Sequence, residues 1–387
     1  MIAGHLQEKN GYFYAVLSYK DGNGKRKTKW IPTGYPVKGN KKKAEAFLTE
    51  QRKSFEPPEE TPPVAREDDE LFVDYLDRWL QIAKGTIAIT TYSSYDGLLN
   101  SAIRPWFRKT QVTLRALTAK DIQDFYTEEL KRVKPNTVIH YHAIIHRALK
   151  YAVRTDLIPV NPADKVDRPK KNGFQPGFYD KDEIRWLFQA VEGTIIEAPV
   201  KLAAFYGLRK SEALGLKWDA VDFESNTLTI RHTVVGCNLD GKYTVIARDT
   251  TKTKSSRRTL PLTPPVRKFL LQLREEQAEN RRLCGNCYHH EDDGYICVNQ
   301  VGRRLSPHFL TNHFNLLLNN SGLWVIRFHD LRHSSASLLL ANGVPLKQIQ
   351  EWLGHSDFST TANIYAHLTA DAKKDTAAAM MRGLGLE

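Results

Sequence analysis

Cysteine is scarce in this sequence, and long apolar runs are absent from it. Four cysteines among 387 residues cannot form the dense disulfide framework of a small secreted domain. No apolar run approaches the ~20 residues that a membrane-spanning helix needs. The N-terminus also lacks the charged and then apolar segments of a signal peptide. We therefore expect a protein of a reducing cytoplasm that has no membrane partner.

Acidic residues are outnumbered by basic ones. The 56 lysines and arginines against 44 aspartates and glutamates give a formal net charge of +12. This excess indicates a polyanionic partner, with nucleic acid as the first candidate. At 387 residues the chain is long enough for two or three domains, and its 41% hydrophobic content supplies cores of ordinary size.

Basic charge is concentrated in residues 1–55, which carry 12 lysines and arginines against 4 acidic residues, a net charge of +8. Residues 11–19 predict a strand, and residues 25–31 predict a second, very basic strand that Pro32-Thr33-Gly34 ends. With a helix expected over 41–52, we predict a three-stranded sheet with one helix. Such a sheet can insert a strand into a DNA groove. The alternative is a solvated, charged hairpin.

Composition divides the rest of the chain. Residues 56–70 hold seven acidic residues, one arginine and four prolines, which predicts a linker. Apolar residues at helical spacing predict a helical domain over 71–166, and the Pro-, Gly- and Lys-rich segment 167–177 predicts a second linker. Residues 178–387 combine helical and short alternating segments, so we expect a mixed α/β domain with a C-terminal tail helix. The expected fold class is multidomain and mainly α, with small β-sheets.

Four helices are expected in the helical domain. The second ends near Pro105, and the third follows Thr118, whose partner Asp121 three residues later resembles a capping box. The fourth covers 136–154 and carries three histidines that do not share one face. His142 and the other two are therefore expected at the surface or near phosphates rather than on a metal ion.

The last sixty residues carry the groups of a phosphoryl-transfer site. His329 and Arg332 are three apart and share one helix face, and His355 and Tyr365 follow within one further helical hairpin. A guanidinium, two imidazoles and a phenol can hold a phosphodiester and attack it. None of them is a carboxylate, so nothing in this group recruits the divalent metal that most nucleases use. We expect metal-free phosphoryl transfer to a tyrosine, with no cofactor.

Two further cations lie upstream. Arg209 follows Gly207 at a break between two predicted helices, where a guanidinium can reach a ligand, and Glu212 one turn later can orient it. Lys252 lies in the hydrophilic hairpin tip 251–258, which can lower a lysine onto a bound strand.

These motifs, in their order and spacing, resemble those of the tyrosine recombinases, the lambda-integrase family. The resemblance rests on GLRKSEALGL (207–216), TKT followed by RTLPL (251–253 and 258–262), HDLRH (329–333), and LGHSDFSTT (353–361) before Tyr365. It covers residues 178–370 directly, and the ordered set is specific although each motif alone is weak. The helical and N-terminal domains resemble the core-site and arm-site DNA-binding domains of integrases from temperate phages and conjugative transposons.

The resemblance implies how the phosphate is attacked and held. Tyr365 is the nucleophile, and its ordinary pKa of ~10 requires neighbouring cations or a proton acceptor. Arg209 and Arg332 clamp the non-bridging oxygens of the scissile phosphate and neutralise the charge that builds in the transition state.

It also implies how protons move. Lys252 protonates the departing 5′ oxygen, although Lys254 lies two residues away in the same hairpin and the choice between them stays open. His329 assists proton transfer at the tyrosine, and His355 bonds the phosphate. The product is a 3′-phosphotyrosine bond, which a 5′-hydroxyl from another duplex reseals without ATP or metal.

The partners follow from the same resemblance. A homo-tetramer binds double-stranded DNA at core and arm sites in a bacterial cytoplasm, passes through a Holliday junction, and takes direction from an excisionase-type factor. The tail helix over 369–382 docks either on its own subunit or on a neighbour. The candidate DNA contacts are Tyr14, Lys25, Arg26, Lys27, Lys29, Lys134 and Lys254.

The expected function is site-specific recombination that integrates and excises a mobile element. A phage and a conjugative transposon are both open as its source. Two alternatives stay beside this function. One is a catalytically silent DNA-binding regulator on the same scaffold, and the other is a type IB topoisomerase-like activity.

Two patterns are similar to zinc sites. His329 and His333 flank Asp330 as in a zinc-protease helix, but Arg332 would put a cation beside the metal. Cys284 and Cys287 have zinc-like spacing near further histidines, but only one such cysteine pair is present. Free thiols in a surface loop are the favoured interpretation of that pair.

Overall fold

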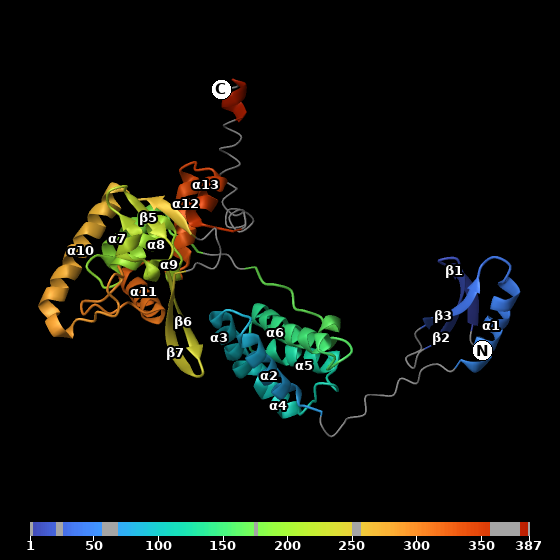
Figure 1. Cartoon of the computed structure of the whole chain (residues 1–387). Helices are drawn as coiled ribbons and strands as arrows, with labels where there is room; N and C mark the ends of the chain where they lie inside the picture. The colour runs from blue at the N-terminus through green and yellow to red at the C-terminus, as the bar shows by residue number, and fades with distance from the viewer. Residues whose placement is uncertain are drawn as a thin grey trace.

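The computed structural model describes residues 3–20, 26–55, 69–173, 177–249, 257–356 and 380–385. Within these ranges the helices and strands form three groups, each with an apolar core (Figure 1). The fold is mainly α with small antiparallel sheets, as the sequence predicts. No helix in these ranges is long and apolar enough to cross a membrane. Outside them lie most of the acidic linker and of the tail helix, and also Lys25, Lys252, Lys254 and Tyr365.

The N-terminal group is a three-stranded sheet with one helix. Its elements are β1 (Ala3–Lys9), β2 (Tyr12–Lys20), β3 (Arg26–Pro36) and α1 (Lys41–Ser54). The strands pair antiparallel in the order β1-β2-β3, and Ala15 and Leu17 pack with Leu48 in the core. The predicted end of the second strand at Pro32 is wrong. Because β3 is an edge strand, it needs no backbone donor on its outer side, and a bulge against β2 carries it on to Pro36.

The second group is a bundle of helices. Its elements are α2 (Phe72–Lys84), α3 (Ile89–Leu98), a π-helical turn (Leu99–Ile103), α4 (Arg104–Thr110), α5 (Ala119–Glu129), α6 (Pro135–Arg154) and a 3-10 turn (Pro162–Lys165). The predicted capping box at α5 is confirmed, with Thr118 and Asp121 each accepting a bond from the other's backbone. The predicted helix end near Pro105 is wrong. The π turn leads directly into α4, because it widens the backbone just before the proline, which offers no N–H.

The expected surface position of His142 on α6 is also wrong. His142 is buried, and its Nδ1 lies 3.0 Å from the hydroxyl of Tyr126 on α5. Burial lowers the pKa of His142 to about 4. The residue is therefore a neutral part of the bundle core and is not available to DNA.

The third group combines helices with two small sheets. Its helices are α7 (Lys181–Val191), α8 (Glu197–Tyr206), α9 (Lys210–Gly215), α10 (Pro264–Cys284), α11 (Pro307–Ser321), α12 (Asp330–Ala341) and α13 (Leu346–Leu353), with 3-10 turns at Trp218–Ala220 and Gly285–Cys287. Its strands are β4 (Val221–Asp222), β5 (Thr227–Ile230), β6 (Thr233–Leu239), β7 (Lys242–Arg248) and β8 (Arg258–Pro261). β5 lies between β4 and β8, whereas β6 and β7 form a separate hairpin. The sequence does not predict β6, because Gly236 and Asn238 are poor strand formers and pairing with β7 makes the strand.

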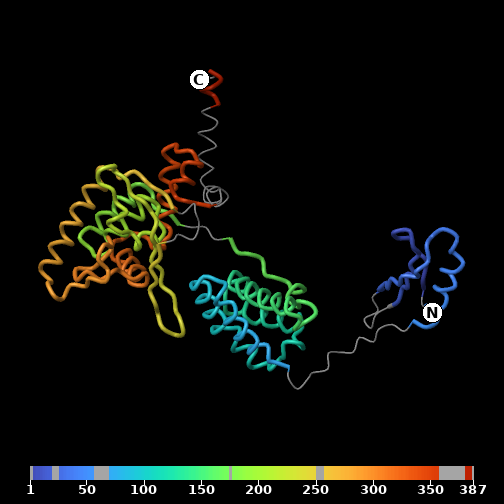
Figure 2. The backbone as a smooth tube through the Cα atoms, in the orientation of Figure 1, coloured from blue at the N-terminus to red at the C-terminus, as the bar shows by residue number. Residues whose placement is uncertain are grey.

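The β6–β7 hairpin extends from the third group to α3 of the bundle (Figure 1). The Asn238 backbone N–H donates to the Ser93 hydroxyl at 3.1 Å, and Leu239 packs against the bundle core. Residues 167–173 run between the two groups without helix or strand (Figure 2). The hairpin is therefore a second connection between the bundle and the third group.

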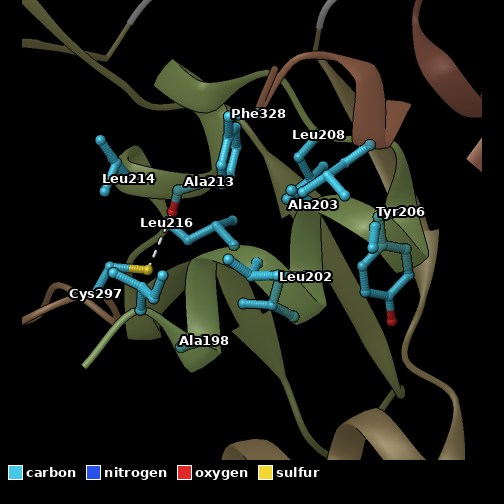
Figure 3. Close-up of a cluster of buried hydrophobic side chains, with 14 of the residues drawn as sticks. Ala198, Leu202, Ala203, Tyr206, Leu208, Ala213, Leu214, Leu216, Cys297 and Phe328 are labelled. Atoms are coloured by element: carbon cyan, nitrogen blue, oxygen red, sulfur yellow. Dashed lines mark hydrogen bonds between the residues drawn. The ribbon is translucent and has the colours of Figure 1, made fainter. Parts of the chain in front are cut away.

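An apolar cluster lies beneath the corner between α8 and α9 (Figure 3). Leu208 and Phe328 are both buried in it, and they directly precede the candidate site residues Arg209 and His329. In the same cluster the Cys297 thiol donates to the backbone of α9, and burial raises the pKa of this thiol to about 12. The core thus fixes the backbone from which two site residues emerge.

Candidate active site

Arg209 stands at the corner between α8 and α9. Gly207 ends α8 with φ +63°, in the left-handed region that favours glycine. A Cβ added there would overlap Leu353, so α13 packs directly against the corner. Arg209 follows as the N-cap of α9, and its side chain turns toward Glu212 in the first turn of the same helix.

A buried carboxylate orients Arg209. Glu212 is 2% exposed, and its oxygens accept bonds from Nη1 of Arg209 at 2.5 Å and from the Arg209 backbone at 3.0 Å. Oε2 also accepts from Nη2 of Arg258 at 3.1 Å. Burial alone would raise the pKa of Glu212, but the guanidiniums of Arg258 and Arg209 outweigh it and hold the pKa below its usual value. Glu212 is therefore an anion at neutral pH.

Arg332 on α12 points toward the same corner. It is 1% exposed, with Nη1 donating to the Gly207 carbonyl at 2.6 Å and Nε donating to Nε2 of His355 at 3.1 Å. His355 follows Gly354, which ends α13 in the left-handed conformation. Desolvation, with Arg332 and Arg209 adding to it, lowers the pKa of His355 to about 3. This imidazole is therefore neutral at pH 7.

His329 stands at the N-terminal end of α12, at the rim of the site. Its ring lies 5.3 Å from the ring of His333, at an interplanar angle of 87°. The residue keeps an exposed surface. Partial desolvation, together with His333 and Arg332, nevertheless lowers the pKa of His329. A neutral imidazole with an exposed edge can accept a proton at neutral pH.

The structure brings four of the six candidate catalytic residues together. They come from the α8–α9 corner, from α12 and from the end of α13, and they are Arg209, His329, Arg332 and His355. The other two, Lys252 and Tyr365, lie outside the described residues, as do the candidate DNA contacts Lys25 and Lys254. Lys134 is exposed as the N-cap of α6.

Arg258 belongs to the same cluster, although the sequence assigns it no role. It begins β8, its side chain is 7% exposed, and its Nε donates to the Trp352 carbonyl at 2.7 Å. The alternating residues 258–262 signal a strand. Nothing local to them indicates that the strand begins beside α13, so the position of Arg258 follows from tertiary packing alone.

No group of three or more potential metal ligands occurs among the described residues, a set that includes both zinc-like patterns. The Asp330 carboxylate pairs with Arg327 at 2.6 Å. Cys284 is a free thiol whose sulfur donates to the Gln300 carbonyl, and Cys287 is free and exposed.

The candidate DNA contacts of β2 and β3 lie on two faces of the N-terminal sheet. The strand register places Tyr14 and Arg26 on the open face, where the rings of Tyr14 and Trp30 lie 6.1 Å apart. Lys27 and Lys29 alternate to the face that carries α1. The basic strand therefore does not present all of its cations to one ligand.

Comparison with known proteins identifies related sequences. The phage integrase family matches residues 178–372, and the N-terminal SAM-like domain of phage integrases matches residues 71–130. A tyrosine recombinase XerC-like protein of Caldanaerobacter subterraneus subsp. tengcongensis is 27% identical over 320 residues, which are 78% of this chain and 80% of that protein. The ICEBs1 integrase of Bacillus subtilis is 26% identical over 289 residues, or 74% of this chain and 76% of that protein.

Solved structures share the fold. The Tn1549 transposon integrase, in complex with a circular intermediate DNA, matches with a TM-score of 0.65 at 17% identity, over 81% of this chain and 100% of that one. A lambda integrase tetramer bound to a Holliday junction matches with a TM-score of 0.58 at 18% identity, over 93% of this chain and 94% of that one.

Proposed function

The chain belongs to the phage integrase family, the tyrosine recombinases, and we propose that it cleaves and rejoins DNA strands through a 3′-phosphotyrosine intermediate. The Tyr365 oxygen attacks the scissile phosphorus, and the bond from phosphorus to the 5′ oxygen breaks. The tyrosine proton passes to His329, and Lys252 or Lys254 protonates the leaving oxygen. A 5′-hydroxyl of another strand then reverses these steps, so the reaction needs neither ATP nor a metal ion.

The convergence of two arginines and two neutral histidines on one corner supports this chemistry most directly. Guanidiniums fixed by neighbouring groups can pair with the non-bridging oxygens and stabilise the charge of the pentacoordinate transition state. The lowered pKa of His329 leaves this imidazole neutral at pH 7, so that a ring nitrogen is free of a proton and can accept one from the tyrosine. The lowered pKa of His355 suits a neutral hydrogen-bonding group beside the phosphate.

We assign this chemistry to the integration and excision of a mobile element. The relatives named above include the integrases of ICEBs1 and of the Tn1549 transposon. In this assignment residues 1–55 bind arm sites, 71–166 bind core sites and 178–387 catalyse exchange. The working unit is a tetramer on DNA, since four strands need four tyrosines, and an excisionase-type factor sets the direction.

Capture of the covalent intermediate tests this function. The full-length protein is incubated with duplexes from the ends of the element, each nicked so that cleavage releases a short fragment and traps the adduct. We expect an adduct that maps to Tyr365, and sequencing of the trapped DNA identifies the core site. Tyr365→Phe should bind the same DNA without forming an adduct, whereas the matched control Tyr243→Phe should form it. An adduct that persists in Tyr365→Phe would overturn the nucleophile assignment.

The same substrates separate the alternatives. Cleavage should continue in excess EDTA, whereas loss that magnesium or zinc restores would indicate a metal-dependent enzyme. Joining of the trapped strand to a second duplex identifies a recombinase, and relaxation of supercoils without joining identifies a topoisomerase-like swivelase. Sequence-specific binding with no adduct from the wild-type protein would identify a silent regulator.

A further inference from the structure

One carboxylate is shared by two arginines beneath the candidate active site. Glu212 accepts from Nη1 of Arg209 at 2.5 Å and from Nη2 of Arg258 at 3.1 Å. The Glu212 and Arg258 side chains are 2% and 7% exposed, whereas the Arg209 side chain is 32% exposed. Of the two arginines, Arg209 is thus the one that reaches the surface where DNA can bind.

The second arginine changes the charge of this cluster. A pair of Arg209 and Glu212 alone has no net charge, so Arg332 would then be the only part of the clamp with a net attraction for a phosphate. With Arg258 added, two guanidiniums and one carboxylate carry a net charge of +1. The Glu212 carboxylate can then orient the guanidinium of Arg209, while the three side chains together keep a positive charge.

The same arginine also secures the end of α13. Arg258 donates through Nε to the Trp352 carbonyl at 2.7 Å, and Arg209 donates through Nη2 to the Gly354 carbonyl at 3.1 Å. Cations at the C-terminal end of a helix interact favourably with its dipole. His355 follows Gly354 directly in the sequence. The hydrogen bonds from the two arginines to the end of α13 therefore also fix the backbone that carries His355.

We propose that Arg258 is a positioning residue of the phosphate clamp, which balances Glu212 so that the carboxylate orients Arg209 without cancelling its charge. This inference rests on the proposed recombinase chemistry. Arg258 itself touches no DNA in this scheme, and its effect reaches the scissile phosphate through Arg209.

An uncharged scissile group distinguishes this role from a purely structural one. The nicked core duplex is prepared with a phosphodiester or with a methylphosphonate at the scissile position, where a methyl group replaces one charged oxygen. Arg258→Met should form adduct on the phosphodiester ~100-fold more slowly than the wild type. On the methylphosphonate, the rate of adduct formation by Arg258→Met should stay within about threefold of the wild-type rate. The reason is that this substrate lacks the negative charge that the cationic cluster stabilises. Arg258→Lys, which keeps the charge, should lie between wild type and Arg258→Met on the phosphodiester.

Arg304→Met is the matched control, because Arg304 forms a half-buried pair with Asp292 elsewhere in the same domain. It should react like the wild type on both substrates. Equal losses of Arg258→Met on both substrates, or no loss on the phosphodiester, would overturn the positioning role.

A double variant covers the case in which Arg258→Met does not fold. Glu212→Gln/Arg258→Met removes both charges of the buried pair and leaves Arg209 cationic beside a neutral amide. It should recover adduct formation on the phosphodiester to within about tenfold of the wild type, and a ~100-fold deficit would overturn the charge balance. Wild-type protein in the same assay tests the proposed function separately, because absence of any wild-type adduct would contradict the recombinase chemistry itself.

Discussion

Replacing Gly215 by alanine should force α9 and the β6–β7 hairpin apart. A Cβ at this position would lie 2.5 Å from the carbonyl oxygen of His232 and 2.7 Å from Cα of Thr233. Both are backbone atoms, so rotation of a side chain cannot relieve the overlap. Restoring an ordinary contact requires a shift of roughly 1 Å between the helix and the strand.

The expected size of the effect follows from this displacement. Overpacking of this kind costs about 1–3 kcal/mol, and each kcal/mol lowers the melting temperature of a unit of this size by about 2–4 °C. Gly215→Ala should therefore lower the melting temperature of the third group of elements, the proposed catalytic unit, by about 6 °C. Because α9 also carries Arg209 and Glu212, adduct formation should slow on the order of 100-fold, as for other misplacements of roughly 1 Å.

Gly97 on α3 offers the matched control. It is also a helical glycine, but it is exposed and has nothing within 4 Å of an added Cβ. Gly97→Ala should stabilise the bundle by about 1 kcal/mol through helix propensity. Calorimetry of the full-length variants and adduct formation at the nicked core site measure both effects. A Gly215→Ala protein that melts and reacts like the wild type would refute the close-packing argument.

Three further predictions concern pH, arm binding and assembly. Because the pKa values of His329 and His355 lie below the usual ~6.5, the rate of adduct formation plotted against pH should show no change near pH 6.5. A change in rate near pH 6.5 that disappears in His355→Gln would contradict the lowered pKa values. The unfolded chain binds more protons than the folded one below ~6.5, so calorimetric stability of the catalytic unit should fall as the pH drops toward the lowered values. In gel shifts at increasing salt, residues 1–55 alone should bind arm DNA with steep salt dependence. Arg26→Ala should weaken that binding more than Lys29→Ala, and equal losses would contradict the assignment of faces. Deleting residues 371–387 should impair synapsis of two sites more than binding of one, whereas normal recombination would mean that the tail does not link protomers.

Features with local signals were predictable from the sequence, and features that depend on a partner element were not. The capping box at Thr118 is formed by residues within one helical turn, so the local sequence was sufficient to predict it. The course of β3 beyond Pro32 depends on the strand lying at a sheet edge, which its own residues do not encode. His142 is buried because Tyr126 of another helix meets it, and the spacing of histidines along α6 carries no information about that contact.

The same distinction between local signals and tertiary contacts applies to the candidate site. The ordered motifs predicted Arg209, His329, Arg332 and His355, and these residues come together in the described structure. The net charge that they offer to a phosphate could not be predicted in this way. Whether Glu212 orients Arg209 or cancels it depends on a third group.

That third group comes from a distant part of the chain. Arg258 begins β8, and its side chain bonds both Glu212 of α9 and the Trp352 carbonyl of α13, which is 94 residues further on. Arg209 and Glu212 counted alone give a neutral pair, whereas the same pair counted with Arg258, which bonds the same carboxylate, gives a net charge of +1. A substitution at Arg258 should accordingly change how strongly the site responds to the charge of its substrate, although none of the six candidate catalytic residues is altered.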